Sequence, residues 1–227
     1  MPPFMVDMLP LILGSLLGPA QFIFTVLLLR SADRGVLKAS SFILGMTVMR
    51  LVQGILFGFV MDEALKSVTQ KDKPGVVSTT LLLVLGIFLL ITAYQQWRHE
   101  DDLDKPPTKW FKWMDRITPM QAFGIGFVWV ATSFNLWVFT LSAIAVIGES
   151  PLNLPDSVLA YLLFILLVES LMLLAILMRV TLPGKAETFL NNMSVWLLKH
   201  NPMLIASTSL VFGLFFLVKG ISRFLAF

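Results

Sequence analysis

Six long apolar runs follow one another along the chain, and a short polar stretch separates each run from the next. A helix needs roughly 20 predominantly apolar residues to cross a bilayer, and every run reaches that length. The pattern therefore predicts an all-α integral membrane protein with six transmembrane helices. We expect these spans at about 8–29, 37–61, 76–97, 119–147, 157–178 and 202–222.

The longest stretch between spans, 98–118, divides them into two sets of three. Because three is odd, a repeated three-span unit would cross the membrane in opposite directions in the two halves, as in many secondary transporters. We therefore expect a 3+3 inverted repeat, with a first repeat over 1–97, a cytoplasmic interfacial loop over 98–118 and a second repeat over 119–227. Within the loop, Lys109–Arg116 mixes aromatic and basic residues, which is typical of a helix on the membrane surface or of an aromatic anchor.

Lysine and arginine are unevenly distributed between the two sides of the predicted membrane. The connections after spans one, three and five hold eleven of them, and the opposite side holds five. Loops rich in Lys and Arg stay in the cytoplasm, so both termini are predicted to lie outside, or in the periplasm, of a multi-pass protein of the cell inner (plasma) membrane. The first basic residue, Arg30, follows the first span, which argues against a cleaved signal peptide.

Composition agrees with this prediction and excludes several kinds of site. The chain is 57% hydrophobic and 14% charged, with a mean hydropathy of +0.83, more apolar surface than a soluble domain of this length can bury. The absence of cysteine excludes disulfides, thiolate metal sites and Cys nucleophiles. The small net charge of +3 does not suggest nucleic acid. No catalytic motif is present, so we expect no enzyme, no metal and no cofactor.

Two charged residues lie inside the apolar runs. Arg50 is near the middle of 42–60, and Glu169 is near the middle of 158–178. An arginine at the bilayer centre costs about 2.5–3.5 kcal/mol on insertion scales, so such residues usually face a partner or a water-filled cavity. The opposite charges suggest that the two residues face each other. Burial favours a protonated carboxyl and a nearby arginine favours an ionised one, so the pair fits proton coupling or a structural ion pair.

Other polar or helix-breaking residues lie within the spans. Gly18 and Pro19 predict an interruption of span one, which is either part of a binding site or a plain proline kink. Ser133 and Asn135 in span four fit a central polar site or hydrogen bonding between helices. The candidate substrate-binding or coupling residues are Gly18, Pro19, Gln21, Thr25, Arg50, Gln53, Ser133, Asn135 and Glu169.

Two segments resemble a known family. Leu17-Gly-Pro-Ala-Gln21, followed by a basic loop, resembles the start of lysine-exporter (LysE) superfamily proteins, and Trp113-Met-Asp-Arg-Ile-Thr-Pro-Met-Gln-Ala-Phe-Gly-Ile-Gly126 is similar to the central signature of their GAP family, also called Sap-like or sulfolipid-addressing proteins. The resemblance implies a LysE-like six-span exporter fold, and relatives are associated with moving glycolipids toward the cell surface. Where such proteins commonly carry Asn-Pro-Lys-Asn in span four, this chain reads Ser133-Phe134-Asn135-Leu136.

Two functions are compatible with these features. The first is a membrane transporter, a secondary exporter that moves a lipid, another amphiphile or a small solute by alternating access, with proton coupling through Glu169. A lipid is favoured because few polar residues line any path. The second is a non-transporting scaffold, assembly factor or accessory subunit of a larger membrane complex, favoured by the altered span-four motif and by nineteen phenylalanines. Expected partners are the lipid bilayer and a lipid or small-molecule substrate, with a homodimer or larger complex left open.

Overall fold

The computed structural model describes residues 3–16, 19–31, 33–67, 76–98 and 116–225, and every regular element in these ranges is an α-helix. The all-α prediction is therefore confirmed for this part of the chain. The helices are α1 (Pro3–Leu16), α2 (Pro19–Leu29), α3 (Gly35–Ser67), α4 (Val76–Arg98), α6 (Pro119–Thr132), α7 (Phe134–Gly148), α8 (Leu154–Thr181) and α9 (Pro183–Phe224).

The first and fourth predicted spans are each broken into two helices. The axes of α1 and α2 meet at 50°, and those of α6 and α7 meet at 71°. The first break ends where α2 begins at Pro19, because proline lacks the amide proton that a helix interior needs and is favoured in the first turn. At the second break Ser133 is extended, with ψ 99°. The Trp137 indole donates a hydrogen bond of 2.9 Å to the Ala131 carbonyl there, so one carbonyl near the break has a partner.

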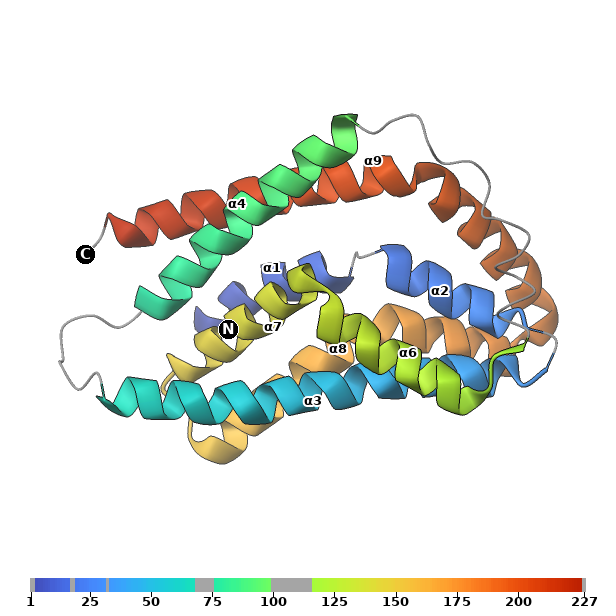
Figure 1. The fold of residues 1–227 in the computed structure, drawn as a ribbon, viewed down its shortest axis with the longest axis horizontal. Coiled ribbons are helices and arrows are strands. Elements are labelled where there is room, and N and C mark those ends of the chain that lie inside the picture. The colour runs from blue at the N-terminus through green and yellow to red at the C-terminus, as the bar shows by residue number, and fades with distance from the viewer. Residues whose placement is uncertain (1–2, 17–18, 32, 68–75, 99–115, 226–227) are drawn as a thin grey trace.

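The helices run mainly along the long axis of the molecule, and their directions alternate (Figure 1). Helices α3 and α8 run in opposite directions, and so do α4 and α9. The broken pair α1–α2 likewise runs opposite to α6–α7. Helix α1 begins and α9 ends at the same end of the bundle, whereas α2 passes to α3 at the other end. Each helix of the first half thus runs opposite to its counterpart in the second half.

A glycine on each helix lets α3 and α6 cross in direct contact. A Cβ atom on Gly45 would collide with the carbonyl oxygen of Phe123, and a Cβ atom on Gly126 would collide with that of Phe42. Helices in lipid associate through this kind of close backbone approach, because no hydrophobic effect drives them together inside the bilayer. The crossing therefore fixes α6 against α3.

Helices α3 and α8 are long and apolar enough to cross a membrane, over Gly35–Gly58 and Leu154–Thr181. The number rises to four if each bent pair counts as one span. The described parts of α4 and α9 contain shorter apolar segments, Gly86–Gln95 and Ser209–Ser222. The structure therefore supports a membrane protein, and the count of six stays a prediction.

Helix α9 begins before the sixth predicted span, 202–222, and its apolar segment Ser209–Ser222 lies within that span. Helix α8 continues to Thr181 and α9 begins at Pro183, so most of the expected polar connection 179–201 is helical. Hydropathy measures suitability for lipid and not helix formation, and the Ala, Leu, Met and Lys residues in this segment favour helix. Leu190 is 1% exposed and belongs to a core cluster, which holds this part of α9 against the bundle. The predicted interfacial loop lies outside the described residues except for Arg98, which ends α4, and its last three residues, 116–118.

Candidate functional site

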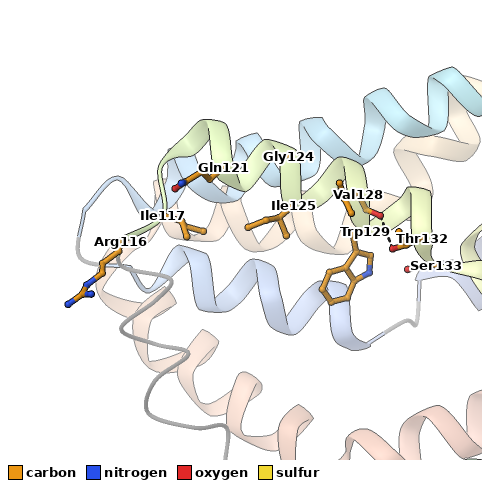
Figure 2. A pocket seen from close by; sticks show the side chains of 9 residues that line it. All are labelled: Arg116, Ile117, Gln121, Gly124, Ile125, Val128, Trp129, Thr132 and Ser133. Atoms are coloured by element: carbon orange, nitrogen blue, oxygen red, sulfur yellow. Dashed lines mark hydrogen bonds between the residues drawn. The ribbon is translucent and has the colours of Figure 1, made fainter.

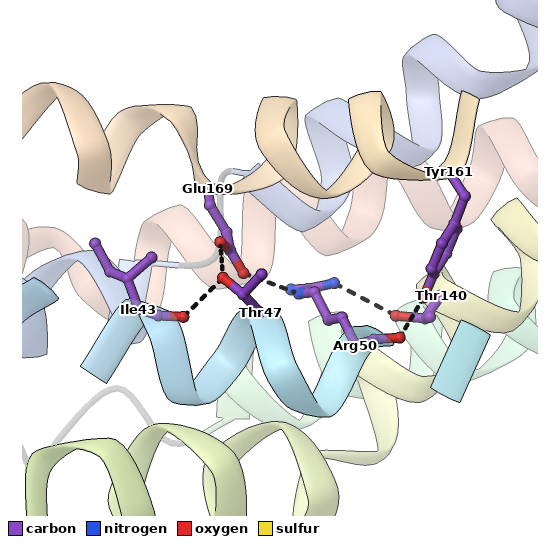
Figure 3. A network of polar contacts seen from close by, with 6 residues as sticks. All are labelled: Ile43, Thr47, Arg50, Thr140, Tyr161 and Glu169. Carbon is purple, nitrogen blue, oxygen red and sulfur yellow. Dashed lines mark hydrogen bonds and ion pairs between the residues drawn. The ribbon is translucent and has the colours of Figure 1, made fainter. Parts of the chain in front are cut away.

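Arg50 and Glu169 face each other inside the bundle (Figure 3). Arg50 on α3 is 0% exposed, and Glu169 on α8 is 3% exposed. The Nε atom of Arg50 lies 3.6 Å from Oε1 of Glu169. The predicted pairing is confirmed: an ion pair joins the middle helices of the two halves, away from the outer surface.

Thr47, one turn before Arg50 on α3, forms a hydrogen bond with the carboxyl oxygen of Glu169 that does not face Arg50. Its Oγ1 lies 2.7 Å from Oε2 of Glu169 and 2.9 Å from the carbonyl oxygen of Ile43. A hydroxyl has one proton to donate and can also accept, so Thr47 donates to one of these two oxygens at a time. If the carboxyl is ionised, Thr47 can donate to it. If the carboxyl is protonated, it can donate to Thr47 while Thr47 donates to Ile43. The same atoms thus satisfy both protonation states of Glu169.

Two further side chains contact Arg50. Its Nη1 donates to Oγ1 of Thr140, on α7, over 3.3 Å. The hydroxyl of Tyr161, on α8, donates to the backbone carbonyl of Arg50 over 2.6 Å. The Tyr161 ring lies so close to α3 that a Cβ atom on Gly54 would collide with it. Glycine at position 54 is therefore what lets the tyrosine reach the arginine carbonyl.

Several polar atoms at this level of α3 and α8 have no hydrogen-bond partner. They are Nη2 of Arg50 and both amide atoms of Gln53, which is 0% exposed, whereas Nε of Arg50 and Oε1 of Glu169 meet only in the 3.6 Å ion pair. A buried donor or acceptor without a partner costs about 1–3 kcal/mol, and native proteins seldom leave such groups together. Waters or the polar part of a ligand would satisfy them, which makes this cluster the candidate functional site.

The remaining candidate residues from the sequence, where the structure describes them, are not part of the cluster around Arg50 and Glu169. Gln21 and Thr25 are buried on α2, where Thr25 donates to the carbonyl of Gln21 over 2.9 Å, a bond that stays within α2 and does not reach Arg50. Pro19 begins α2 and Asn135 belongs to α7, and the side chains of both lie outside the described part of the structure. Gly18 lies outside the described residues as well.

Ser133 lies in a groove on α6 (Figure 2). The groove has a volume of about 800 Å³. Arg116 marks one end, and Thr132 with Ser133 marks the other, at the break between α6 and α7. Between them the groove is lined by Ile117, just before α6, and by one stripe of α6 formed by Gln121, Gly124, Ile125, Val128 and Trp129. Among the described residues, no group of three or more His, Cys, Asp or Glu side chains could hold a metal ion.

Comparison with known proteins identifies the family. The sequence model described as "Sap, sulfolipid-1-addressing protein" matches residues 8–222. The chain belongs to the Sap family. The Sap part of the sequence resemblance is thus confirmed, whereas the wider lysine-exporter relationship stays a prediction. No curated protein and no solved structure matches the chain.

In this Sap-family protein, the candidate residues predicted from the sequence did not include three members of the central cluster, Thr47, Thr140 and Tyr161. Thr140 and Tyr161 lie in apolar runs, where single hydroxyl-bearing residues are commonly part of helix packing. Gly54 was a sequence indication of the Tyr161 contact, because a glycine on a helix surface leaves room for an aromatic ring from a neighbouring helix. The sequence held no such indication of the Thr140 contact, because only the 71° bend between α6 and α7 sets the direction in which α7 continues.

Proposed function

We propose that this Sap-family protein is a secondary exporter that moves a lipid or similar amphiphile across the plasma membrane by alternating access. The buried cluster of Arg50, Glu169 and Thr47 is its coupling site, and a proton is the coupling ion. The protein acts as a carrier and not as an enzyme, and it works without a cofactor.

The arrangement of the helices supports a six-span inverted repeat. Each half consists of a broken pair followed by two longer helices, and counterpart helices run in opposite directions (Figure 1). Helices α1 and α9 have their free ends at the same end of the bundle. With the basic connections after spans one, three and five in the cytoplasm, both termini lie on the outer side.

The observation that carries the proposal is the position of Thr47 between two acceptors, Glu169 and the Ile43 carbonyl. A structural ion pair needs only an ionised carboxylate, whereas this geometry accommodates the carboxyl with and without its proton. Ionisable residues inside a membrane commonly mark proton or substrate pathways. Release of the Glu169 proton strengthens its attraction to Arg50, and uptake of a proton weakens it, so protonation can control whether α3 and α8 stay together.

A lipid is the favoured substrate for two reasons. The family is named for a protein that addresses sulfolipid-1, and an apolar groove runs along α6. A small solute would need a polar path, and the buried polar cluster is confined to one level of the bundle. The lipid therefore is expected to pass its polar part by this cluster while its chains remain in an apolar environment.

Reconstitution of the purified protein into liposomes tests this function. Liposomes contain headgroup-labelled lipids of several classes, and transfer between leaflets is followed by quenching from outside, with and without a proton gradient. We expect gradient-dependent transfer by the native chain and its loss in Glu169→Gln, which keeps size and hydrogen bonding but cannot ionise. Glu149→Gln, the same change at the end of α7, is the matched control and should transfer lipid normally.

The rival function is a scaffold within a larger membrane complex, and the departure at Ser133-Phe134-Asn135 from the family's span-four motif favours it. No transfer by the native chain for any lipid class, together with a stoichiometric partner after mild solubilisation, would replace the exporter with the scaffold. Unchanged gradient-dependent transfer in Glu169→Gln would keep the exporter and remove the coupling role of the carboxyl.

A further inference from the structure

The groove on α6 has the chemistry of a site for an amphiphile. Beyond Gln121 its lining is apolar, with Gly124, Ile125, Val128 and Trp129 along one stripe of α6. One end carries the exposed guanidinium of Arg116, just before the first turn of α6 (Figure 2). An arginine fork binds phosphate and carboxylate oxygens well. The two features together match a molecule with one anionic end and one long apolar chain.

The dimensions fit a single acyl chain. The 14 residues of α6 extend about 21 Å, which exceeds the roughly 15 Å occupied by the hydrocarbon of one leaflet. The groove volume of about 800 Å³ lies within the roughly 300–1,000 Å³ typical of small-molecule sites, so one acyl chain lying along α6 is an occupant of suitable size.

Gly124 keeps the groove open. It lines the groove, and a Cβ atom built on it has no atom within 4 Å. This differs from Gly126 two residues later, where a Cβ atom would strike the backbone of α3. Close packing of α6 on α3 therefore requires the glycine at 126 but not the glycine at 124. The absence of a side chain at 124 leaves the space for something other than the described part of this chain.

We propose that the α6 groove is a lateral binding site for one acyl chain of an anionic bilayer lipid, with the headgroup held by Arg116 and the chain running along Gly124 toward the break at Ser133. The binding stands on the groove itself. The further idea that a transported lipid leaves the bilayer through this groove rests on the proposed exporter function. In that case the end of the acyl chain lies at the hinge between α6 and α7.

Photolabelling in nanodiscs tests the site. The native protein is embedded in neutral phosphatidylcholine with a trace of phosphatidylglycerol that carries a photoactivatable group on one acyl chain, and the labelled peptides are mapped by mass spectrometry. We expect the main adducts on 117–132. Gly124→Leu should lower this labelling at least fivefold, because the new side chain fills the groove. Gly58→Leu is the matched control: it also adds a side chain where no atom lies within 4 Å, but on α3, and it should leave the labelling unchanged.

The charge is tested separately. Arg116→Gln should remove most of the preference for phosphatidylglycerol over labelled phosphatidylcholine, whereas Arg116→Lys should retain it. Adducts confined to other helices, or equal labelling in native protein and Gly124→Leu, would overturn the proposal. So would a native dimer without groove labelling that Gly124→Leu converts to a monomer, since a second copy would then be the occupant. Groove labelling without lipid transfer in liposomes would uphold the site and reject the exporter function.

Discussion

Replacing the two buried charged residues with leucine distinguishes an ion pair that only stabilises the fold from one that also couples transport to protons. Three variants are needed: Arg50→Leu, Glu169→Leu and the double change. Each single change leaves one buried charge facing an apolar side chain. The double change removes both charges and leaves two apolar side chains of moderate size at the same place.

The magnitudes follow from the geometry. At the observed 3.6 Å between Nε and Oε1, Coulomb attraction is about 5 kcal/mol for an effective dielectric constant of about 20. Removing one partner from a buried pair costs about 3–5 kcal/mol, whereas replacing both with apolar residues is commonly neutral or stabilising. For a protein of this size that single loss lowers Tm by about 6–20 °C. The hydroxyl of Thr47 keeps a partner in the double variant, because it already lies 2.9 Å from the Ile43 carbonyl.

Thermal unfolding in detergent and lipid transfer in liposomes are measured on all three variants. We expect both single variants to be destabilised, the double variant to unfold close to the native temperature, and all three to lack gradient-dependent transfer. A double variant as unstable as the sum of the singles would show that the two side chains are not energetically coupled. A stable double variant with normal transfer would refute the coupling role of the pair.

Three further predictions concern α3: two test contacts around the ion pair, and one tests the crossing of α3 with α6. Tyr161→Phe removes the hydrogen bond to the Arg50 carbonyl and should cost about 0.6–1.7 kcal/mol in unfolding measurements; no loss would mean that the hydroxyl finds an equal partner elsewhere. Thr47→Val should abolish gradient-dependent lipid transfer while Thr47→Ser retains it, and equal transfer in both would exclude a hydroxyl role. Gly45→Ala forces a contact with the Phe123 carbonyl and should destabilise by about 1–3 kcal/mol. Gly58→Ala, in open space, should be stabilising by about 0.5–1 kcal/mol; equal effects at the two glycines would contradict the α3–α6 crossing.

The sequence predicted the features that depend on local chemistry. A buried arginine and glutamate of opposite sign had to find partners, so Arg50 and Glu169 could be paired before any helix was placed. Gly18-Pro19 predicted the first break for an equally local reason. The features that depend on where helices cross were not predictable: Thr140 joins Arg50 only because α7 leaves α6 at 71°. Gly54 and Gly58 have the four-residue spacing of small residues that lets helices pack closely, yet Gly58 lies in open space.

The glycine contacts also constrain how an exporter of this shape could move. Gly45 and Gly126 join α3 to α6, and Gly86 brings the backbones of α4 and α9 together, since a Cβ atom there would meet the Leu217 amide nitrogen at 2.7 Å. Each joined pair takes one helix from each half of the chain. A rotation of residues 1–97 against 119–227 would break both contacts, so the halves of the sequence are poor candidates for the moving bodies. We expect α3 and α6 to move together against α8, with the break at Ser133 absorbing the change. Such a motion must release the Arg50–Glu169 ion pair, the Thr47–Glu169 hydrogen bond and the bond from the Tyr161 hydroxyl to the Arg50 carbonyl, all of which join α3 to α8.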